Sequence, residues 1–324
     1  MDVLVEKQFI EQFMDDFLDV NHPQAILTMF KSYAGIKVYS DCSIDYAIDN
    51  IFFQMLLSNN TKLRSKDDFV NKSNSNDLSR RAIALCGDER EVWVDSYEGA
   101  DGIYLSSSAY KSKMDLILSN QKTIRLKDHP KFKWSDIFPI KYIPGNCALM
   151  ADNFILSKET KVKNNAFPII RNFKKSLSLL TILTATKAMN HSVENKVKSE
   201  SQLFEEVEQE VSKMKSKLND FCRNEKINTN IQVIPFFKDL LKRTHSFDLH
   251  DRYLITKYAI VEVGKGFDLL PRPMNKEKVD HKIRVKTIFD KDTYDDLRSL
   301  TPLYTDYVKW YKEKHNPETF LPFE

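Results

Sequence analysis

The sequence predicts an α/β protein in which helices flank a mixed sheet, and three features lead to this prediction. Residues 176–186 (SLSLLTILTAT) and 230–237 (NIQVIPFF) are apolar runs of strand length, and a long amphipathic segment lies between them. This succession of strand, helix and strand indicates two parallel strands with a right-handed crossover. Two further apolar runs, within 247–257 and 259–266, follow each other so closely that we expect them to pair as neighbouring strands.

The first half of the chain has a weaker pattern. Phe9, Ile10 and Phe13 recur at helical spacing, so residues 2–19 are expected to form an amphipathic helix. After it we expect a strand in 34–41 (AGIKVYSD), a helix in 45–58 and a polar loop over 59–80. A half-buried strand is expected at 91–97 (EVWVDSY), whereas the pattern of 101–119 does not distinguish a helix from a strand.

The second half contains the longest predicted helix, from about residue 192 to 223. Its apolar residues recur every three or four positions, which favours a helix packed on a sheet over a coiled-coil seam. A final helix is expected after Thr293, broken near Pro302. We divide the chain into an N-terminal α/β half, residues 1–165, and a second half, residues 166–324.

The composition excludes several classes of protein. Among 324 residues, 49 basic and 46 acidic side chains give a net charge of +3, so the overall charge predicts no particular partner. The four cysteines are far apart, which is typical of reduced thiols and not of disulfides or a zinc site. Without a secretory signal or an apolar stretch of roughly 18 residues, a soluble cytoplasmic protein is expected. The sequence has no nucleotide-binding or metal-binding motif, so neither a cofactor nor a metal is expected.

One stretch, FDLHDRYLITKYAIVEVGKGFD (247–268), carries the features of a phosphate site. A histidine can attack a phosphodiester as a nucleophile, and an arginine two residues further along a strand lies on the same face. His250 and Arg252 have this spacing. Gly264 and Gly266, two of only seven glycines, enclose Lys265 and would let backbone N–H groups approach an anion. The alternative is a β-bulge at these glycines, with His250 only hydrogen-bonded in the core.

These residues resemble the signature of the phospholipase D superfamily, H-x-K-x4-D-x6-G-S-x-N, which lies on two adjacent strands after a βαβ unit. The spacing fits without a gap from His250 onward, with Gly264 at the glycine position. Four positions differ in character. They are Arg252 at the lysine position, Lys257 at the aspartate position, Lys265 at the serine position and Phe267 at the asparagine position.

The sequence is more similar to a degenerate branch of that superfamily, the phospholipase-D-like C-terminal domain of a eukaryotic cytokinesis protein that begins with a microtubule-interacting-and-transport (MIT) module. That branch reads H-D-R and then G-x-G-x-D, as do residues 250–252 and 264–268 of this chain. The resemblance covers roughly residues 170–324, and the transport module is not recognisable. It implies a phospholipase-D-like fold and, because that branch is regarded as a non-catalytic binder of membrane phosphoinositides, a binding function.

From the residues and the resemblance together we expect a phosphate site with His250 as the candidate catalytic residue. Phosphate contacts are expected from Arg252, Lys265, Gly264, Gly266 and Lys257, with Asp251 and Asp268 in supporting positions. Three functions stay open. The first is binding of nucleic acid, with a role in prokaryotic antiviral defence suggested by analogy. The second is a metal-independent phosphodiesterase or nuclease that acts as a homodimer, and the third is a phosphoinositide or protein-interaction module.

An internal repeat would account for the single histidine. An offset of 99 residues places ADNFILSK (151–158) over HDRYLITK (250–257), with Asp152 over Asp251 and Ala151 over His250. In that case the first half is a degenerate repeat without a nucleophile, and a second copy of the chain would have to supply the other histidine. Two further basic segments, 281–286 and 125–134, are interpreted as a lysine-protected edge strand and a surface loop, with phosphate contact as the alternative.

Overall fold

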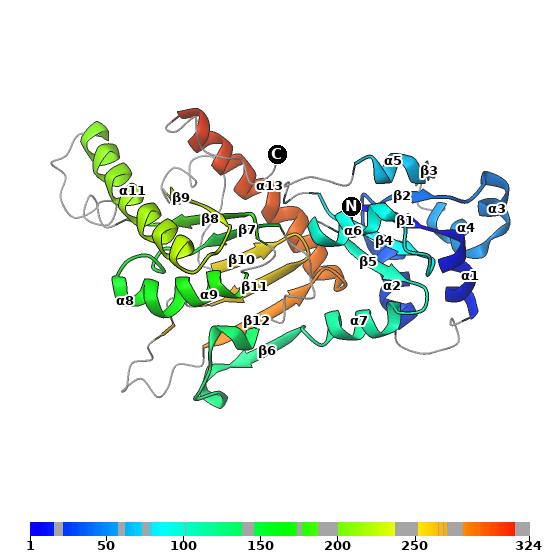
Figure 1. The fold of residues 1–324 in the computed structure, drawn as a ribbon, viewed down its shortest axis with the longest axis horizontal. Coiled ribbons are helices and arrows are strands. Elements are labelled where there is room, and N and C mark those ends of the chain that lie inside the picture. The colour runs from blue at the N-terminus through cyan, green and yellow to red at the C-terminus, as the bar shows by residue number, and fades with distance from the viewer. Residues whose placement is uncertain are drawn as a thin grey trace.

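The computed structural model contains two sheets that lie side by side along the longest axis of the molecule (Figure 1). The structure describes residues 1–15, 22–57, 62–72, 78, 80–100, 102–137, 146–173, 177–186, 200–236, 252–264, 266–267, 269–270 and 281–314. Helices flank both sheets, so the expected α/β class with helices around a mixed sheet is confirmed at this level. Within the described residues, no helix is long and apolar enough to cross a membrane.

The first sheet is parallel throughout and has the strand order β3-β2-β1-β4-β5. Its strands are β1 (Asp2–Val5), β2 (Lys37–Ser40), β3 (Arg64–Ser65), β4 (Ala82–Cys86) and β5 (Ile103–Ser106). The helices between and after them are α1 (Lys7–Asp15), α2 (His22–Ser32), α3 (Ile44–Asp49), α4 (Ile51–Leu57), α5 (Lys66–Val70), α6 (Val92–Ala100) and α7 (Tyr110–Leu118). The order reverses between β1 and β4, because the chain first adds strands on one side of β1 and then on the other.

Several expectations for this half were wrong, for a common reason. Asp2–Val5 is a strand and not the start of a helix, and β4 lies in a segment that was not assigned. Strands covered on both faces carry apolar runs without alternation, so period-two patterns do not find them. Conversely, the alternating segment 91–97 enters helix α6, where Val92 is exposed and Val94 is buried. The polar segment 59–80 contains β3 and α5.

The second sheet is mixed and has the strand order β6-β12-β11-β10-β7-β8-β9. Its strands are β6 (Lys122–Arg125), β7 (Cys147–Ala151), β8 (Leu179–Thr184), β9 (Asn230–Pro235), β10 (Arg252–Thr256), β11 (Ala259–Val263) and β12 (Lys282–Thr287). Strands β7, β8 and β9 are parallel, and the other neighbours are antiparallel. The helical segments are η2 (Leu126–Asp128), η3 (Trp134–Ile137), α8 (Glu159–Lys161), the π-helix η5 (Val162–Ala166), α9 (Phe167–Asn172), α11 (Glu200–Asn224) and α13 (Lys291–Lys314).

The main predictions for the second half are confirmed. Strands β8 and β9 are parallel neighbours, with Leu179 paired to Asn230, and helix α11 connects them in sequence and packs on β9. Strands β10 and β11 form an antiparallel pair joined at Lys257-Tyr258. The prediction of a break in the last helix was wrong, because α13 continues through Pro302.

The predicted internal repeat is not present in the structure. Ala151 is the last residue of β7, and residues 152–158 form turns where the repeat required a strand. The sheets also differ in kind, one being parallel and the other mixed. They divide the chain between β5 and β6, so the expected boundary after residue 165 lies within the second sheet's helices. Segment 281–286 alternates as expected, but β12 lies between β6 and β11 and is not an edge strand.

Buried polar contacts connect the two sheets. The Tyr258 hydroxyl donates to the carbonyl oxygen of Ala82 at 2.9 Å and accepts from the Ala82 N–H at 3.0 Å. Arg81, which is 6% exposed, donates from Nε to the carbonyl oxygen of Lys257 at 2.7 Å. On helix α13, the ring of Tyr294 stacks on Tyr33 at a centroid distance of 4.4 Å. The β10–β11 hairpin and α13 are therefore joined to the first sheet.

Candidate anion site at one end of the second sheet

The residues that motivate a phosphate site lie at one end of the seven-stranded sheet, where β7 and β8 end and β10 begins. Across β10, β7 and β8 the register aligns Tyr253, Ala151 and Leu183. The next residues outward, Arg252, Asp152 and Thr184, therefore form one row across three adjacent strands. Residues in one row of a pleated sheet point to the same face, so these three side chains share a face.

Asp152 is the buried centre of this row. Its Oδ1 accepts hydrogen bonds from the backbone N–H groups of Phe154 at 2.6 Å and Ile155 at 2.9 Å. Its Oδ2 accepts from the backbone N–H of Phe267 at 2.5 Å. One carboxylate thus fixes both the loop after β7 and the segment that contains the second glycine.

Arg252 lies against this carboxylate without a hydrogen bond to it. Its Nε is 4.0 Å from Asp152 Oδ2, and its guanidinium carbon is 5.2 Å from the ring centroid of Phe154. The side chain is 17% exposed, and within the part of the chain that the structure describes its buried Nε has no hydrogen-bond partner. The buried hydroxyl of Thr184 also lacks one. Unpaired buried polar atoms cost about 1–3 kcal/mol each, so two in one row indicate a place where a ligand or a rearrangement would supply partners.

The two glycines of the G-K-G segment have different roles. The N–H of Gly266 donates to the carbonyl oxygen of Val263 at 3.0 Å, which closes a four-residue turn at the end of β11. Gly266 has a φ of +106°, a conformation that a residue with a side chain rarely adopts. Gly264 has no such constraint, and a Cβ added there would meet no atom within 4 Å. Gly266 is thus required by the turn, whereas Gly264 borders open space.

The structure brings together three of the eight sequence-predicted site residues. Arg252, Gly264 and Gly266 lie at the same end of the sheet. The other residues expected there, His250, Asp251, Lys265 and Asp268, lie outside the described residues.

Lys257 does not belong to this site, so its interpretation as a phosphate ligand beside Arg252 was wrong. It is fully buried at the far end of β10. At about 3.3 Å per residue, five residues of strand place it roughly 16 Å from Arg252. Lys257 occupies the aspartate position of the superfamily pattern, but its backbone carbonyl oxygen accepts from Arg81 Nε in the contact between the two sheets.

Three further cations lie at the same end of the sheet as Arg252. Arg125 ends β6 and pairs with Lys282, the first residue of β12, and both side chains are exposed. Lys127 follows in η2 and is also exposed. In sequence these residues belong to two separate basic segments, 125–134 and 281–286, because their pairing across β6 and β12 depends on the sheet order.

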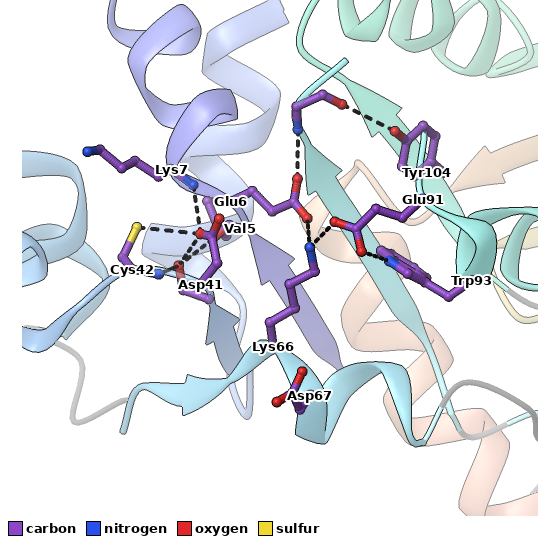
Figure 2. Close-up of polar contacts among 12 residues, drawn as sticks. Val5, Glu6, Lys7, Asp41, Cys42, Lys66, Asp67, Glu91, Trp93 and Tyr104 are labelled. Carbon is purple, nitrogen blue, oxygen red and sulfur yellow. Dashed lines mark hydrogen bonds and ion pairs between the residues drawn. The ribbon is translucent and has the colours of Figure 1, made fainter. Parts of the chain in front are cut away.

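A second charged cluster lies where the strands of the first sheet end, at the reversal between β1 and β4 (Figure 2). This is the position at which parallel α/β sheets usually bind ligands. Glu6 follows β1 and Gly87 follows β4. Lys66 is the first residue of α5, and Glu91 directly precedes α6. Sequence analysis missed the cluster because its members come from three distant segments. A charged residue directly after an apolar run, as in VLVE, is the signal that could have found it.

The cluster is an ion-pair network in which the charged groups bind one another. Lys66 Nζ lies 2.7 Å from Glu6 Oε1 and also pairs with Glu91, whose other oxygen accepts from the Trp93 indole at 2.9 Å. The Gly87 N–H donates to Glu6 Oε2 at 2.8 Å. Burial opposes the charged form of Lys66, but its hydrogen bonds to Glu6 and Glu91 outweigh this and raise its pKa above the ordinary value. Lys66 therefore remains an ammonium at neutral pH and cannot act as a base or nucleophile.

The comparisons with known proteins add no family to these observations. No family model matches the chain, and no curated protein matches it. In the part of the chain that the structure describes, no group of three or more His, Cys, Asp or Glu side chains could hold a metal ion. The site is therefore interpreted from its own geometry.

Proposed function

We propose that this protein binds nucleic acid at the end of the seven-stranded sheet, with Arg252 contacting a phosphate. The observation that carries the proposal is the largely buried side chain of Arg252, whose Nε has no hydrogen-bond partner among the described residues. In sequence, His250 lies two residues before Arg252, and Lys265 lies between Gly264 and Gly266. We therefore assign His250 and Lys265 to the same phosphate. Of the phospholipase-D-like interpretation, the proposal keeps the phosphate-binding role of these residues.

The chemistry of the row favours an anionic ligand. A guanidinium presents its N–H groups in a planar fork that matches two oxygens of a phosphate. Among the described residues, Asp152 is the negative charge next to Arg252, but three backbone N–H groups already bind its oxygens, and it makes no hydrogen bond to Arg252. Arg252 therefore keeps its donors for a ligand, and Asp152 holds the surrounding loops in place.

The additional cations favour a polymer over a single phosphate. Arg125 on β6 is three strands away from Arg252 on β10. At about 4.8 Å between neighbouring strands, this is roughly 14 Å. One phosphate group cannot contact both residues. Lys282 and Arg125 pair one row beyond the row of Arg252 and therefore point to the opposite face, so a polymer that passes around this end of the sheet is needed to contact all three.

The test is a titration of labelled single-stranded and duplex oligonucleotides with the purified protein between 50 and 200 mM salt. Binding should weaken steeply as salt rises, because phosphate contacts release counterions. Arg252→Ala should weaken binding by roughly 30-fold or more, since truncating a desolvated charged contact costs about 2–5 kcal/mol. Arg171→Ala is the control, because Arg171 is exposed on α9 and pairs with Glu225. Equal affinities for wild type and Arg252→Ala would overturn the proposal.

Catalysis is a separable claim and concerns His250. A phosphohistidine mechanism predicts cleavage of the oligonucleotide in EDTA, dependence on dimer formation, and complete loss on His250→Ala. Binding without cleavage would leave the nucleic-acid-binding function and remove the metal-independent phosphodiesterase. Binding to phosphoinositide vesicles but not to oligonucleotides would instead favour the membrane-surface function that the resemblance implies.

A further inference from the structure

An unusually exposed apolar stripe lies on helix α3. Ile44 and Ile48 are 71% and 55% exposed, and their spacing of four residues places them on one face of the helix. Ile51, at the start of α4, is 62% exposed. Asp45 and Asp49 are exposed between and beside them. Contiguous exposed aliphatic side chains mark interaction surfaces, and this one, the α3 stripe, is bordered by negative charge.

An apolar groove lies between α11 and the segment that runs from α8 to α9. It has a volume of about 800 Å³. Buried or half-buried apolar side chains form its floor, namely Leu156, Val162, Phe167, Met214, Leu218 and Phe221. The rings of Phe167 and Phe221 stack at 3.9 Å, which gives the floor a rigid centre. We refer to this surface as the α11 groove.

The rim of the α11 groove is basic. Lys158, Lys213 and Lys217 are exposed there and form no ion pair within the described residues. The acidic residues of the rim are Glu159, Glu210 and Asp220, of which Glu159 pairs with Lys163 at 2.9 Å and Asp220 with Arg223 at 3.4 Å. Lys163 and Lys217 hold the pKa of Glu159 below its ordinary value. An apolar ligand that brings carboxylates would therefore fit both the floor and the rim.

We propose that the α3 stripe of one copy of this protein docks in the α11 groove of a second copy. The stripe carries aliphatic side chains bordered by Asp45 and Asp49, and the groove offers an apolar floor bordered by lysines, so the two surfaces are complementary in apolar character and in charge. Figure 1 shows α3 and α11 at opposite ends of the longest axis, so the stripe cannot reach the groove of its own chain. The contact is independent of the proposed function, since it uses neither Arg252 nor its neighbours.

Such a contact joins two different surfaces and therefore leaves one stripe and one groove open. Two copies either satisfy both by lying antiparallel, or further copies add in series. Both arrangements predict self-association that depends on concentration. Both also predict that damage to either surface alone prevents the contact.

The test measures molar mass by light scattering and sedimentation from micromolar to millimolar protein. Wild type should associate, and Ile48→Glu on the stripe or Met214→Glu in the groove should each weaken association by at least about tenfold, as for central interface residues. Val92→Glu is the control, because Val92 is a 92% exposed aliphatic residue on α6, outside the stripe. A wild type that stays monomeric to millimolar concentration would overturn the proposal.

Mixing the two damaged variants gives the decisive outcome. Ile48→Glu keeps an intact groove and Met214→Glu keeps an intact stripe, so together they should form a 1:1 complex that grows no further. A charge exchange adds a second readout: Asp45→Lys with Asp49→Lys should abolish self-association, as should Lys213→Glu with Lys217→Glu, and mixing the two double variants should restore association. Association that none of these variants alters, or a mixture without the 1:1 complex, would contradict the contact. Capture of an acidic helix from another protein by the groove of monomeric wild type would do so as well.

Discussion

The carboxylate of Asp152 accepts a hydrogen bond from the backbone N–H of Phe267 at 2.5 Å, although the two residues are 115 positions apart in sequence. This bond joins the loop after β7 to the turn after β11, and Arg252 begins the strand between them. The ring of Phe267 is buried and packs on Trp134, with 5.6 Å between the two ring centroids. Asp152 therefore sets where the glycine turn lies relative to the guanidinium of Arg252.

Asp152→Ala should destabilise the fold. The substitution leaves the N–H groups of Phe154, Ile155 and Phe267 without their acceptor, and an unsatisfied buried donor costs about 1–3 kcal/mol. Urea unfolding followed by Trp fluorescence measures the change. Asp95→Ala is the control, because Asp95 is exposed and, among the described residues, its ion-pair partner is the exposed Arg90; such pairs contribute little. Equal midpoints for the two variants would show that the Asp152 bonds do not hold the loops.

The two glycines of the G-K-G segment should respond differently to alanine. Gly266 has a φ of +106°, so Gly266→Ala strains the backbone and should cost about 1–2 kcal/mol or more. Gly264→Ala should be nearly neutral, because its Cβ meets no atom within 4 Å. The same urea experiment compares them, each serving as the control for the other. A larger loss of unfolding free energy for Gly264→Ala than for Gly266→Ala would show that the backbone constraint does not lie at Gly266.

The second half of the fold could be predicted because its signals are local. Segments 179–184 and 230–235 are short apolar runs, and α11 between them keeps a helical period over its length. The first sheet could not be predicted, because β1 and β4 are buried strands whose apolar runs resemble those of the neighbouring helices. Val92 shows the problem, because it fits a strand pattern in sequence but is an exposed residue of a helix.

The candidate site was predictable only where its residues are neighbours in sequence. Arg252, Gly264 and Gly266 belong to one hairpin and follow from spacing alone. Asp152 was noted only as part of a chance repeat, because its role depends on Phe267, which no local pattern connects to it. The same applies to Glu6 and Lys66, which meet only after the parallel sheet forms.

Arg81 should be necessary for the two sheets to unfold together. Its side chain donates to the Lys257 carbonyl oxygen at 2.7 Å and to the Thr301 hydroxyl at 2.8 Å. Hydrogen bonds to a charged group contribute about 1.5–3 kcal/mol each, so Arg81→Met should cost roughly 3 kcal/mol or more. Arg80→Met is the matched control, because Arg80 is the exposed neighbour. Variants that keep only Trp93 or only Trp134 of the three tryptophans let fluorescence follow each sheet separately, and an unchanged midpoint for Arg81→Met would refute this link.

Lys66→Met should destabilise the first sheet, because it leaves the carboxylates of Glu6 and Glu91 facing each other without a cation. The side chain of Glu6 is 10% exposed, whereas that of Glu91 is 46% exposed and partly screened by solvent. We therefore expect a loss of about 2 kcal/mol at pH 7, below the 3–5 kcal/mol of a fully buried pair. The double variant Glu6→Gln, Lys66→Met removes one of the two unpaired carboxylates and should recover part of the loss.

The loss caused by Lys66→Met should depend on pH in a defined direction. The hydrogen bond from Lys66 holds the pKa of Glu91 below its ordinary value of 4.5. A carboxyl group with a lowered folded pKa stabilises the fold above its ordinary pKa and loses this contribution as pH falls through the lowered value. Lys66 has a raised pKa, so its contribution to the stability of the fold is complete below its ordinary pKa of 10.5 and is lost only at more alkaline pH.

The difference in unfolding free energy between wild type and Lys66→Met should therefore be largest between about pH 5 and 10 and should shrink toward pH 3. A difference that is constant from pH 3 to 7 would mean that the ion pairs with Glu6 and Glu91 do not contribute to stability.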